Sequence, residues 1–293
     1  MRTRYPAAAW LCLAAAFGVS GAEAHESWVE PSAFEIESDH PIGVRICIAD
    51  GLEGRALARD PWRIARFVAL DSEGEVQVVG LEGAEPAGAL RLTRPGSYVI
   101  AYQSERDYLQ VPAAKFESFL QEEGLEHIVS RRTRQDAQPA AVREAYSRYM
   151  KALVQVGGTD PPADRPIGMT LELIAETGNP EPAPAEQFRL LFRDAPLAGA
   201  LVVATRLGTA DPELHARTDV DGRVRFALRD AGLWRIAAVH MTEAPRSIGA
   251  DWESFWASLA LEIPATAVDA RPDAGKTRTP CANRAIQERF DGI

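Results

Sequence analysis

His25 is the residue of this sequence best suited to chemistry, provided that the chain is cut just before it. Ala22-Glu23-Ala24 places small residues at the −3 and −1 positions of a signal-peptidase site, after a basic start and an apolar run. Cleavage there would free the α-amino group of His25. That amine, with a reference pKa of about 7.7–8.0, and the imidazole Nδ1 would chelate one metal ion. The alternative is that His25 is only a frayed terminus.

His240 is the best partner for His25, because it stands at the end of an expected strand over residues 234–241. A side chain there is held by a rigid element and still reaches solvent. Met241 would add a thioether beside it. The competing interpretation makes His240 a hydrogen-bonded histidine at the rim of a sheet and Met241 part of the core. No His-x-x-x-His pair is present, so folding must assemble any site.

His127 is a third candidate ligand, near an expected break between helices and beside the carboxylates of residues 122–126. A solvated helix residue or a helix cap would explain it equally well. His40 and His215 are expected to be ordinary surface residues. Imidazole and amine ligands suit nickel or copper, with cobalt less favoured on affinity alone.

Two further segments combine acidic residues with turn or aromatic residues. Residues 251–256 either line a pocket, with a carboxylate orienting a ligating imidazole, or form a loop whose tryptophans cover one end of a sheet. Residues 219–222 are expected to be a plain β-turn, because the third acid and closing Glu of an EF-hand are missing. Nucleophile-elbow and dinucleotide-binding motifs are absent from the sequence.

Composition indicates an exported protein. Removing residues 1–24 leaves 269 of 293 residues, enough for two domains, and a net charge of −11 in place of −10. No basic stripe is visible, so nucleic acid is not an expected partner. The apolar run is shorter than the roughly 20 residues of a transmembrane helix. We therefore expect a periplasmic or secreted protein with no membrane insertion after cleavage.

Two cysteines, Cys47 and Cys281, survive the cut. In an oxidising compartment they can form one disulfide that ties the C-terminal tail to the first domain. Two unpaired buried thiols are the alternative.

The elements that must position these residues are mainly β. Residues 25–111 alternate with period two and predict an N-terminal β-sandwich, with a hairpin turn at residues 71–74. Residues 167–265 predict a C-terminal Greek-key sandwich, and residues 266–293 a loosely ordered tail.

Residues 112–166 predict a helical connector followed by a stiff Pro-rich linker. Apolar residues follow helical spacing over residues 116–129 and again over 142–153, before Gly157-Gly158. The expected fold is mainly β: a signal peptide over 1–24, then two Ig-like or transthyretin-like β-sandwich domains joined by the helical connector.

Several stretches in a specific order carry a resemblance. They are residues 24–28 (AHESW) with Glu30-Pro31, 123–127 (EGLEH), 146–149 (YSRY), 151–153 (KAL), 196–200 (PLAGA), 218–226, 238–241 (AVHM) and 251–259 (DWESFWASL). With them the chain resembles the secreted bacterial proteins of unknown function grouped with NikM-like, periplasmic nickel- or cobalt-transport components. The resemblance implies an exported protein that binds a transition metal, without implying a demonstrated activity.

NikM-like proteins also have a ligand set around the mature N-terminus. This chain departs from them by having no transmembrane anchor and by having Ser27 at the third mature position, where they have a histidine. Neither transport coupling nor a square-planar site from the first three residues therefore follows from the resemblance. The Thr-Asp-x-Asp-Gly turn and its surroundings also resemble transthyretin-like sandwiches, for the second domain only.

The leading hypothesis is a periplasmic protein that binds a divalent transition-metal ion (nickel, cobalt or copper) and is an accessory to a metal-uptake transporter. His25 and His240 would hold the ion, with His127 as a further candidate. The first alternative is a metal-free β-sandwich binding or adhesion module in which every histidine is structural. The second is a copper-dependent oxidative enzyme, by analogy with the ligands of oxidative polysaccharide-cleaving enzymes.

Overall fold

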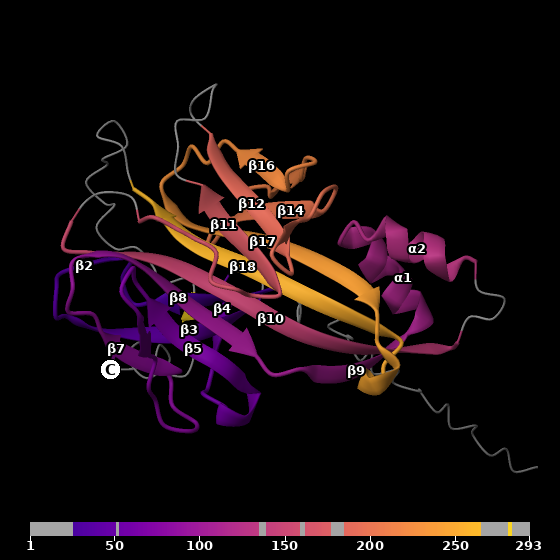
Figure 1. The fold of residues 1–293 in the computed structure, drawn as a ribbon, viewed down its shortest axis with the longest axis horizontal. Coiled ribbons are helices and arrows are strands. Elements are labelled where there is room, and N and C mark those ends of the chain that lie inside the picture. The colour runs from indigo at the N-terminus through magenta and orange to yellow at the C-terminus, as the bar shows by residue number, and fades with distance from the viewer. Residues whose placement is uncertain are drawn as a thin grey trace, which may run out of the picture.

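The computed structural model describes residues 26–50, 53–134, 139–158, 162–176, 185–264 and 281–282 (Figure 1). The expected signal peptide, His25 and most of the expected tail lie outside these residues. No described helix is long and apolar enough to cross a membrane.

A long sheet is the centre of the fold. Its strands run in the order β15 (Leu214–Arg217), β14 (Leu201–Arg206), β17 (Gly232–Glu243), β18 (Trp252–Ile263), β10 (Ala141–Val156), β8 (Gly96–Ser104), β5 (Ile64–Leu70) and β6 (Glu75–Gln77), while β2 (Glu35–Ile36) and β9 (Asp107–Pro112) also pair with β10. Every named pairing is antiparallel except those of β10 with β18 and with β2, which are parallel.

Two smaller sheets cover opposite faces of the long sheet. The N-terminal sheet contains β1 (Ser27–Pro31), β3 (Pro41–Asp50), β4 (Glu53–Leu57), β7 (Gly88–Arg91) and β19 (Cys281–Ala282). The C-terminal sheet contains β11 (Leu171–Glu176), β12 (Glu186–Phe192), β13 (Ala195–Pro196) and β16 (Arg223–Phe226). Along β8, Tyr98 and Ile100 pack into the core of the first sheet, whereas Val99 and Ala101 pack into that of the second. Since side chains alternate along a strand, the two cores lie on opposite faces.

The expected mainly β, sandwich-like architecture is confirmed. The long sheet joins strands from both expected domains, since β10 pairs with β8 on one side and with β18 on the other. The hairpin at residues 71–74 is also confirmed, with the backbone N–H groups of Glu73 and Gly74 donating to Asp71 Oδ1.

The helices occupy only the first part of the expected connector. Helix α1 (Ala113–Glu122) and helix α2 (Glu126–Arg132) meet at Gly124 and pack on the same face of the long sheet as the N-terminal sheet, against Val239 and Trp256. Two short 3₁₀ helices, η1 (Pro61–Arg63) and η2 (Arg246–Ile248), lie elsewhere.

The prediction of a helix over residues 142–153 is wrong, because this segment is strand β10. Most residues of β10 are buried, and the strand lies between β18 and the strands β8 and β9. A central strand buried on both faces loses the period-two alternation that marks a half-buried strand. Its apolar residues then happened to fit helical spacing.

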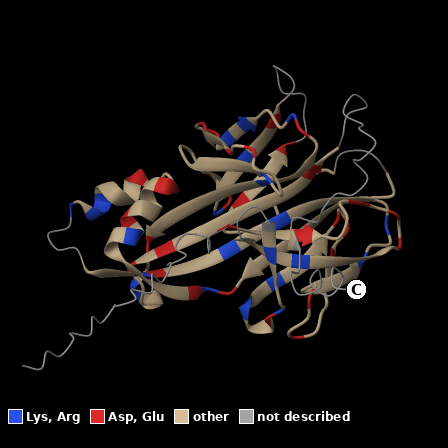
Figure 2. Ribbon diagram, turned by 180° about the vertical axis from the view of Figure 1, so that it is seen from behind, with Lys and Arg blue, Asp and Glu red and all other residues tan. Residues whose placement is uncertain are grey.

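The interpretation of residues 251–256 as a loop is also wrong, because β18 already begins at Trp252. The carboxylates in this segment bind arginines: Glu253 pairs with Arg106 at 2.7 Å, and Asp251 with Arg143 at 2.9 Å. Over the rest of the ribbon, too, basic and acidic residues are interspersed along the strands rather than gathered in one region (Figure 2).

Candidate metal centre

The structure brings His127 and His240 together. Strand β14 pairs with β17 only as far as Ala238, so the last residues of β17 form a sheet edge against which α2 packs. Across this edge, His127 Nε2 lies 3.1 Å from the backbone oxygen of Met241. A carbonyl oxygen only accepts, so Nε2–H donates, and Nδ1 of His127 is the ring nitrogen not used in this bond.

The two imidazole rings stack, with centroids 5.7 Å apart and planes at 16°. His240 also meets Phe192 of β12 edge-on, at a centroid distance of 4.5 Å. His240 thus contacts both a histidine from the helical layer and a phenylalanine from the C-terminal sheet. Phe255, its partner on β18, lies 5.1 Å from Phe192 and extends the aromatic wall.

His240 is in the form that binds a metal. Burial lowers its pKa to about 4, and the charges of His127 and Arg193 contribute to the shift. Arg193 lies in the turn between β12 and β13, where Arg193 and Asp194 adopt positive φ angles of 52° and 64°. Its guanidinium lies 4.8 Å from the centre of the Phe192 ring. His240 is therefore neutral at pH 7, with a ring nitrogen free of its proton.

The pair does not by itself form a complete ligand set. The lone pair of an imidazole nitrogen lies in the plane of its ring. Because the two rings are nearly parallel and stacked, their lone pairs point along separate parallel planes, and one ring must turn before both nitrogens can reach the same ion. The described residues place no third His, Cys, Asp or Glu at ligand spacing beside the two histidines. Further ligands would come from water or from residues outside the described ranges.

His25, the predicted first ligand, lies outside the described residues. The described chain starts at Glu26, whose carboxylate contacts Arg235 at 2.7 Å. Arg235 precedes His240 by five positions on β17, or about 17 Å, and its side chain points to the opposite face. A single ion shared by His25 and His240 would therefore require Glu26 to leave Arg235.

Sequence reasoning missed a cavity of about 350 Å³ beside Glu26, between the start of β1 and the end of α1. Its lining includes Glu123, Glu213 and His215. Glu213 immediately precedes β15 and His215 lies within it, and their spacing of two residues places both side chains on the same face. Burial and the neighbouring carboxylates raise the pKa of Glu123 to about 7. The period-two spacing of Glu213 and His215 was the available signal. His215 is exposed, as expected, and so is His40.

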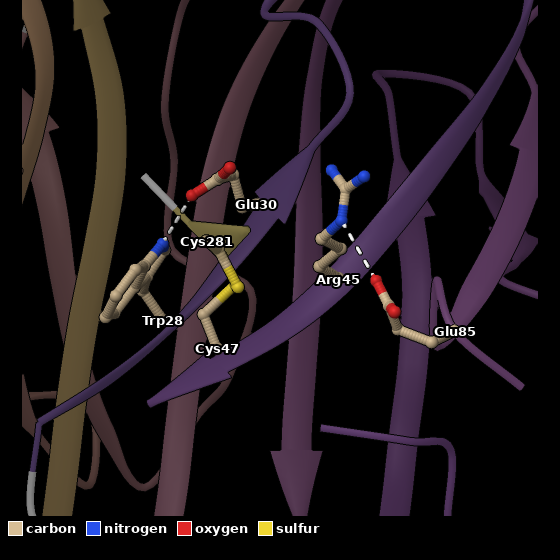
Figure 3. Close-up of a disulfide and its surroundings, with 6 residues drawn as sticks. All are labelled: Trp28, Glu30, Arg45, Cys47, Glu85 and Cys281. Atoms are coloured by element: carbon tan, nitrogen blue, oxygen red, sulfur yellow. Dashed lines mark hydrogen bonds and ion pairs between the residues drawn. A yellow bond between two sulfur atoms is a disulfide. The ribbon is translucent and has the colours of Figure 1, made fainter. Parts of the chain in front are cut away.

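Of the two predicted states of the cysteines, the disulfide is confirmed. Cys47 of β3 and Cys281 of β19 are bonded, with Cα atoms 6.0 Å apart (Figure 3). Glu30 lies beside this bond, as Figure 3 shows, and its Oε2 accepts a 2.9 Å hydrogen bond from the indole N–H of Trp28. The turn at residues 219–222 is confirmed as well, closed by a Gly222 N–H to Asp219 O bond of 3.0 Å.

The fold and this histidine pair define a mainly β protein with a candidate metal centre at a sheet edge. The chain belongs to the family described as "Domain of unknown function (DUF4198)", which matches residues 22–242. No curated protein matches it. Among solved structures, dimeric latent PorU from Porphyromonas gingivalis aligns at 12% identity with a TM-score of 0.17. That alignment covers 84% of this chain but only 21% of PorU.

Proposed function

We propose that this protein binds a divalent transition-metal ion, nickel, copper or cobalt, with His127 and His240 as its central ligands. One observation carries the proposal: two histidines from distant parts of the sequence meet at a sheet edge, 5.7 Å between ring centres. His240 is neutral at pH 7, and the hydrogen bond of His127 to Met241 uses Nε2 and leaves Nδ1 to face an ion. Nitrogen donors suit these ions.

His25 enters the proposal as an additional ligand. If the chain is cut before it, its amine and imidazole would chelate an ion, and the sheet-edge pair would complete the coordination once Glu26 moves away from Arg235. The acidic cavity beside Glu26 offers the alternative that His25 binds its ion there. The two arrangements differ in whether His25 and His240 depend on each other.

The cellular setting is part of the same proposal. A cleaved signal peptide would place the protein in the periplasm, and the resemblance to NikM-like components suggests a role as an accessory to a metal-uptake transporter. The family match starts at residue 22, near the proposed cut after Ala24, and the family's description assigns it no role.

The test is calorimetric titration of metal-free protein, produced with His25 as its first residue, with Ni²⁺, Cu²⁺ and Co²⁺. We expect about one equivalent to bind, and His240→Ala and His127→Ala each to weaken binding by tenfold or more, roughly the 1.4 kcal/mol or more of a lost ligand. His40→Ala is the matched control at an exposed histidine outside both candidate sites and should leave the titration unchanged.

Two further chains separate the parts of the proposal. His25→Ala, or a chain that keeps one residue ahead of His25, should weaken binding if the terminal chelate takes part. A double variant, His25→Ala with His240→Ala, reports whether both hold one ion, since their effects would then not add. Titrations unchanged in His127→Ala and His240→Ala would refute the central pair and leave a metal-free binding module.

A further inference from the structure

The N-terminal sheet holds a second group of metal-ligand side chains, away from the histidine pair. It consists of Glu30 on β1, Cys47 on β3 and Cys281 on β19. One ligand atom from each lies within 4.8 Å of the other two. All three residues are buried, with exposed fractions of 1%, 0% and 0%. In Figure 3 the Glu30 carboxylate lies next to the disulfide, whereas Arg45 turns toward Glu85.

Glu30 has unused bonding capacity toward this group. Its Oε2 accepts from Trp28, and the backbone N–H of Cys281 also acts on the carboxylate, while Oε1 is buried and makes no hydrogen bond of standard geometry to the described residues. Buried polar atoms of this kind are few in native proteins and call for an explanation. Burial raises the pKa of Glu30, which favours the protonated acid while the disulfide is intact.

We propose that the dithiol form of this protein binds Zn²⁺ through Cys47 Sγ, Cys281 Sγ and a carboxylate oxygen of Glu30. Thiolates select zinc among common divalent ions. At tetrahedral zinc, with Zn–S near 2.3 Å and Zn–O near 2.0–2.2 Å, ligand atoms lie roughly 3.6–3.8 Å from one another. The three ligand atoms lie within 4.8 Å of one another, and the two sulfurs, which are bonded to each other in this structure, must move apart to reach that spacing. Water would take the fourth position.

The chemistry is a redox step followed by an exchange of metal for protons. A dithiol reductant becomes a disulfide, and the Cys47–Cys281 bond takes its two electrons and two protons to give two thiols. Zn²⁺ then displaces both thiol protons into solvent and binds the Glu30 carboxylate. In the reverse direction a disulfide oxidant takes two electrons from the two thiolates and two protons from solvent, the Cys47–Cys281 bond forms again, and Zn²⁺ leaves.

The position of β19 explains how an ion would enter. Strand β19 lies at the edge of the N-terminal sheet and pairs with β4 through only two residues, Cys281 and Ala282. Once the disulfide opens, no covalent bond links Cys281 to β3, and the two-residue pairing with β4 is short, so the sulfurs can separate and admit an ion. Zinc would then replace the disulfide as the link between Cys281 and β3, and the redox state would decide whether the ion is bound.

Cobalt is the probe, because thiolate-to-cobalt charge transfer absorbs in the near ultraviolet and reports sulfur ligands specifically. The full chain is reduced with a phosphine, freed of reductant without oxygen, and titrated with Co²⁺ and then Zn²⁺. We expect a thiolate band that saturates near one equivalent in the reduced protein, is bleached by Zn²⁺, and is missing in the oxidised protein. No such band in the reduced protein would overturn the proposal.

Glu30→Gln tests the carboxylate ligand while preserving shape and the neutral state. It should still form the disulfide and should bind Co²⁺ at least about tenfold more weakly, because one charged ligand is lost. Glu37→Gln, at an exposed carboxylate, is the matched control and should match the parent. Parent-like affinity in Glu30→Gln would remove Glu30 from the site.

This experiment is independent of the histidine pair. His240→Ala should leave the thiolate band unchanged, whereas Cys47→Ser with Cys281→Ser should abolish the band and leave any binding by the histidines intact. A thiolate band that disappears in His240→Ala would contradict the assignment.

Discussion

Lys151 is the side chain whose loss should damage this fold most. It lies in the middle of β10, 1% exposed, with its ammonium 2.6 Å from Asp164 Oδ1 and 3.1 Å from Glu172 Oε1. It also donates to the backbone oxygens of Arg165 and Leu173 at 3.2 and 3.1 Å. Through these contacts one cation joins the long sheet to β11 and to the segment that precedes it.

Lys151→Met keeps the length and packing of the side chain but leaves both carboxylates buried without a counter-charge. Glu172 still accepts from the backbone N–H groups of residues 167–169, and Asp164 from that of Ala175. Removing one partner of a buried ion pair costs about 3–5 kcal/mol. We expect a loss of that size in the free energy of unfolding at pH 7.5, measured by urea denaturation.

The loss should depend on pH. Burial already raises the pKa of Asp164 in the parent, while Lys151 opposes the shift. Without Lys151 the pKa rises further, so the protonated acid is favoured in the folded state. A raised pKa in the folded state gives stability that is present at low pH and is lost as pH rises through it. The difference between variant and parent should therefore be smaller at pH 5 than at pH 7.5.

Lys115→Met is the control, because Lys115 is exposed on α1 and its loss should change stability by no more than about 0.5 kcal/mol. If Lys151→Met lost less than about 1 kcal/mol, or lost the same amount at both pH values, the reasoning from buried charge would be refuted.

Two further predictions concern the helical layer. Gly124→Ala should lower the free energy of unfolding by about 1–3 kcal/mol in urea denaturation and weaken metal binding at His127. The reason is that Gly124 has a φ of 64° and an added Cβ would lie 2.9 Å from Leu201 Cβ. Gly74→Ala is the control, because an added Cβ there would have no atom within 4 Å. Glu123→Gln should stabilise the protein above pH 7 and leave it unchanged near pH 4, because the raised pKa of Glu123 means that its ionised form is disfavoured in the folded state; equal stability of variant and parent at pH 8.5 would contradict this.

Much of the local structure follows from local sequence. The acidic turn at residues 71–74, the helix pair broken at Gly124 and the turn at residues 219–222 all depend on residues within a few positions of each other. Hydrophobic alternation and turn residues likewise predicted a mainly β protein. The Cys47–Cys281 disulfide was foreseen as one of two alternatives, since two cysteines allow only one intramolecular pairing.

The candidate site could be predicted only in part. His240 was recognised from its place near the end of a strand, and His127 from its place between helices, but nothing in the sequence showed that they meet. Their contact depends on where β14 stops pairing with β17, which leaves the edge open to α2. The sequence did not single out Glu30 as a candidate ligand, because only the folded chain places it beside Cys47 and Cys281.

The sequence by itself determined the fold class, the turns, the two helices and the residue types that could bind metal. Tertiary structure decided that residues 141–156 form a strand, that this strand runs parallel to β18, and that Lys151 meets two acids there. The physical reason is that periodicity records one buried face of an element. A strand buried on both faces, or a pair of side chains joined across an edge, depends on neighbours that local sequence does not specify.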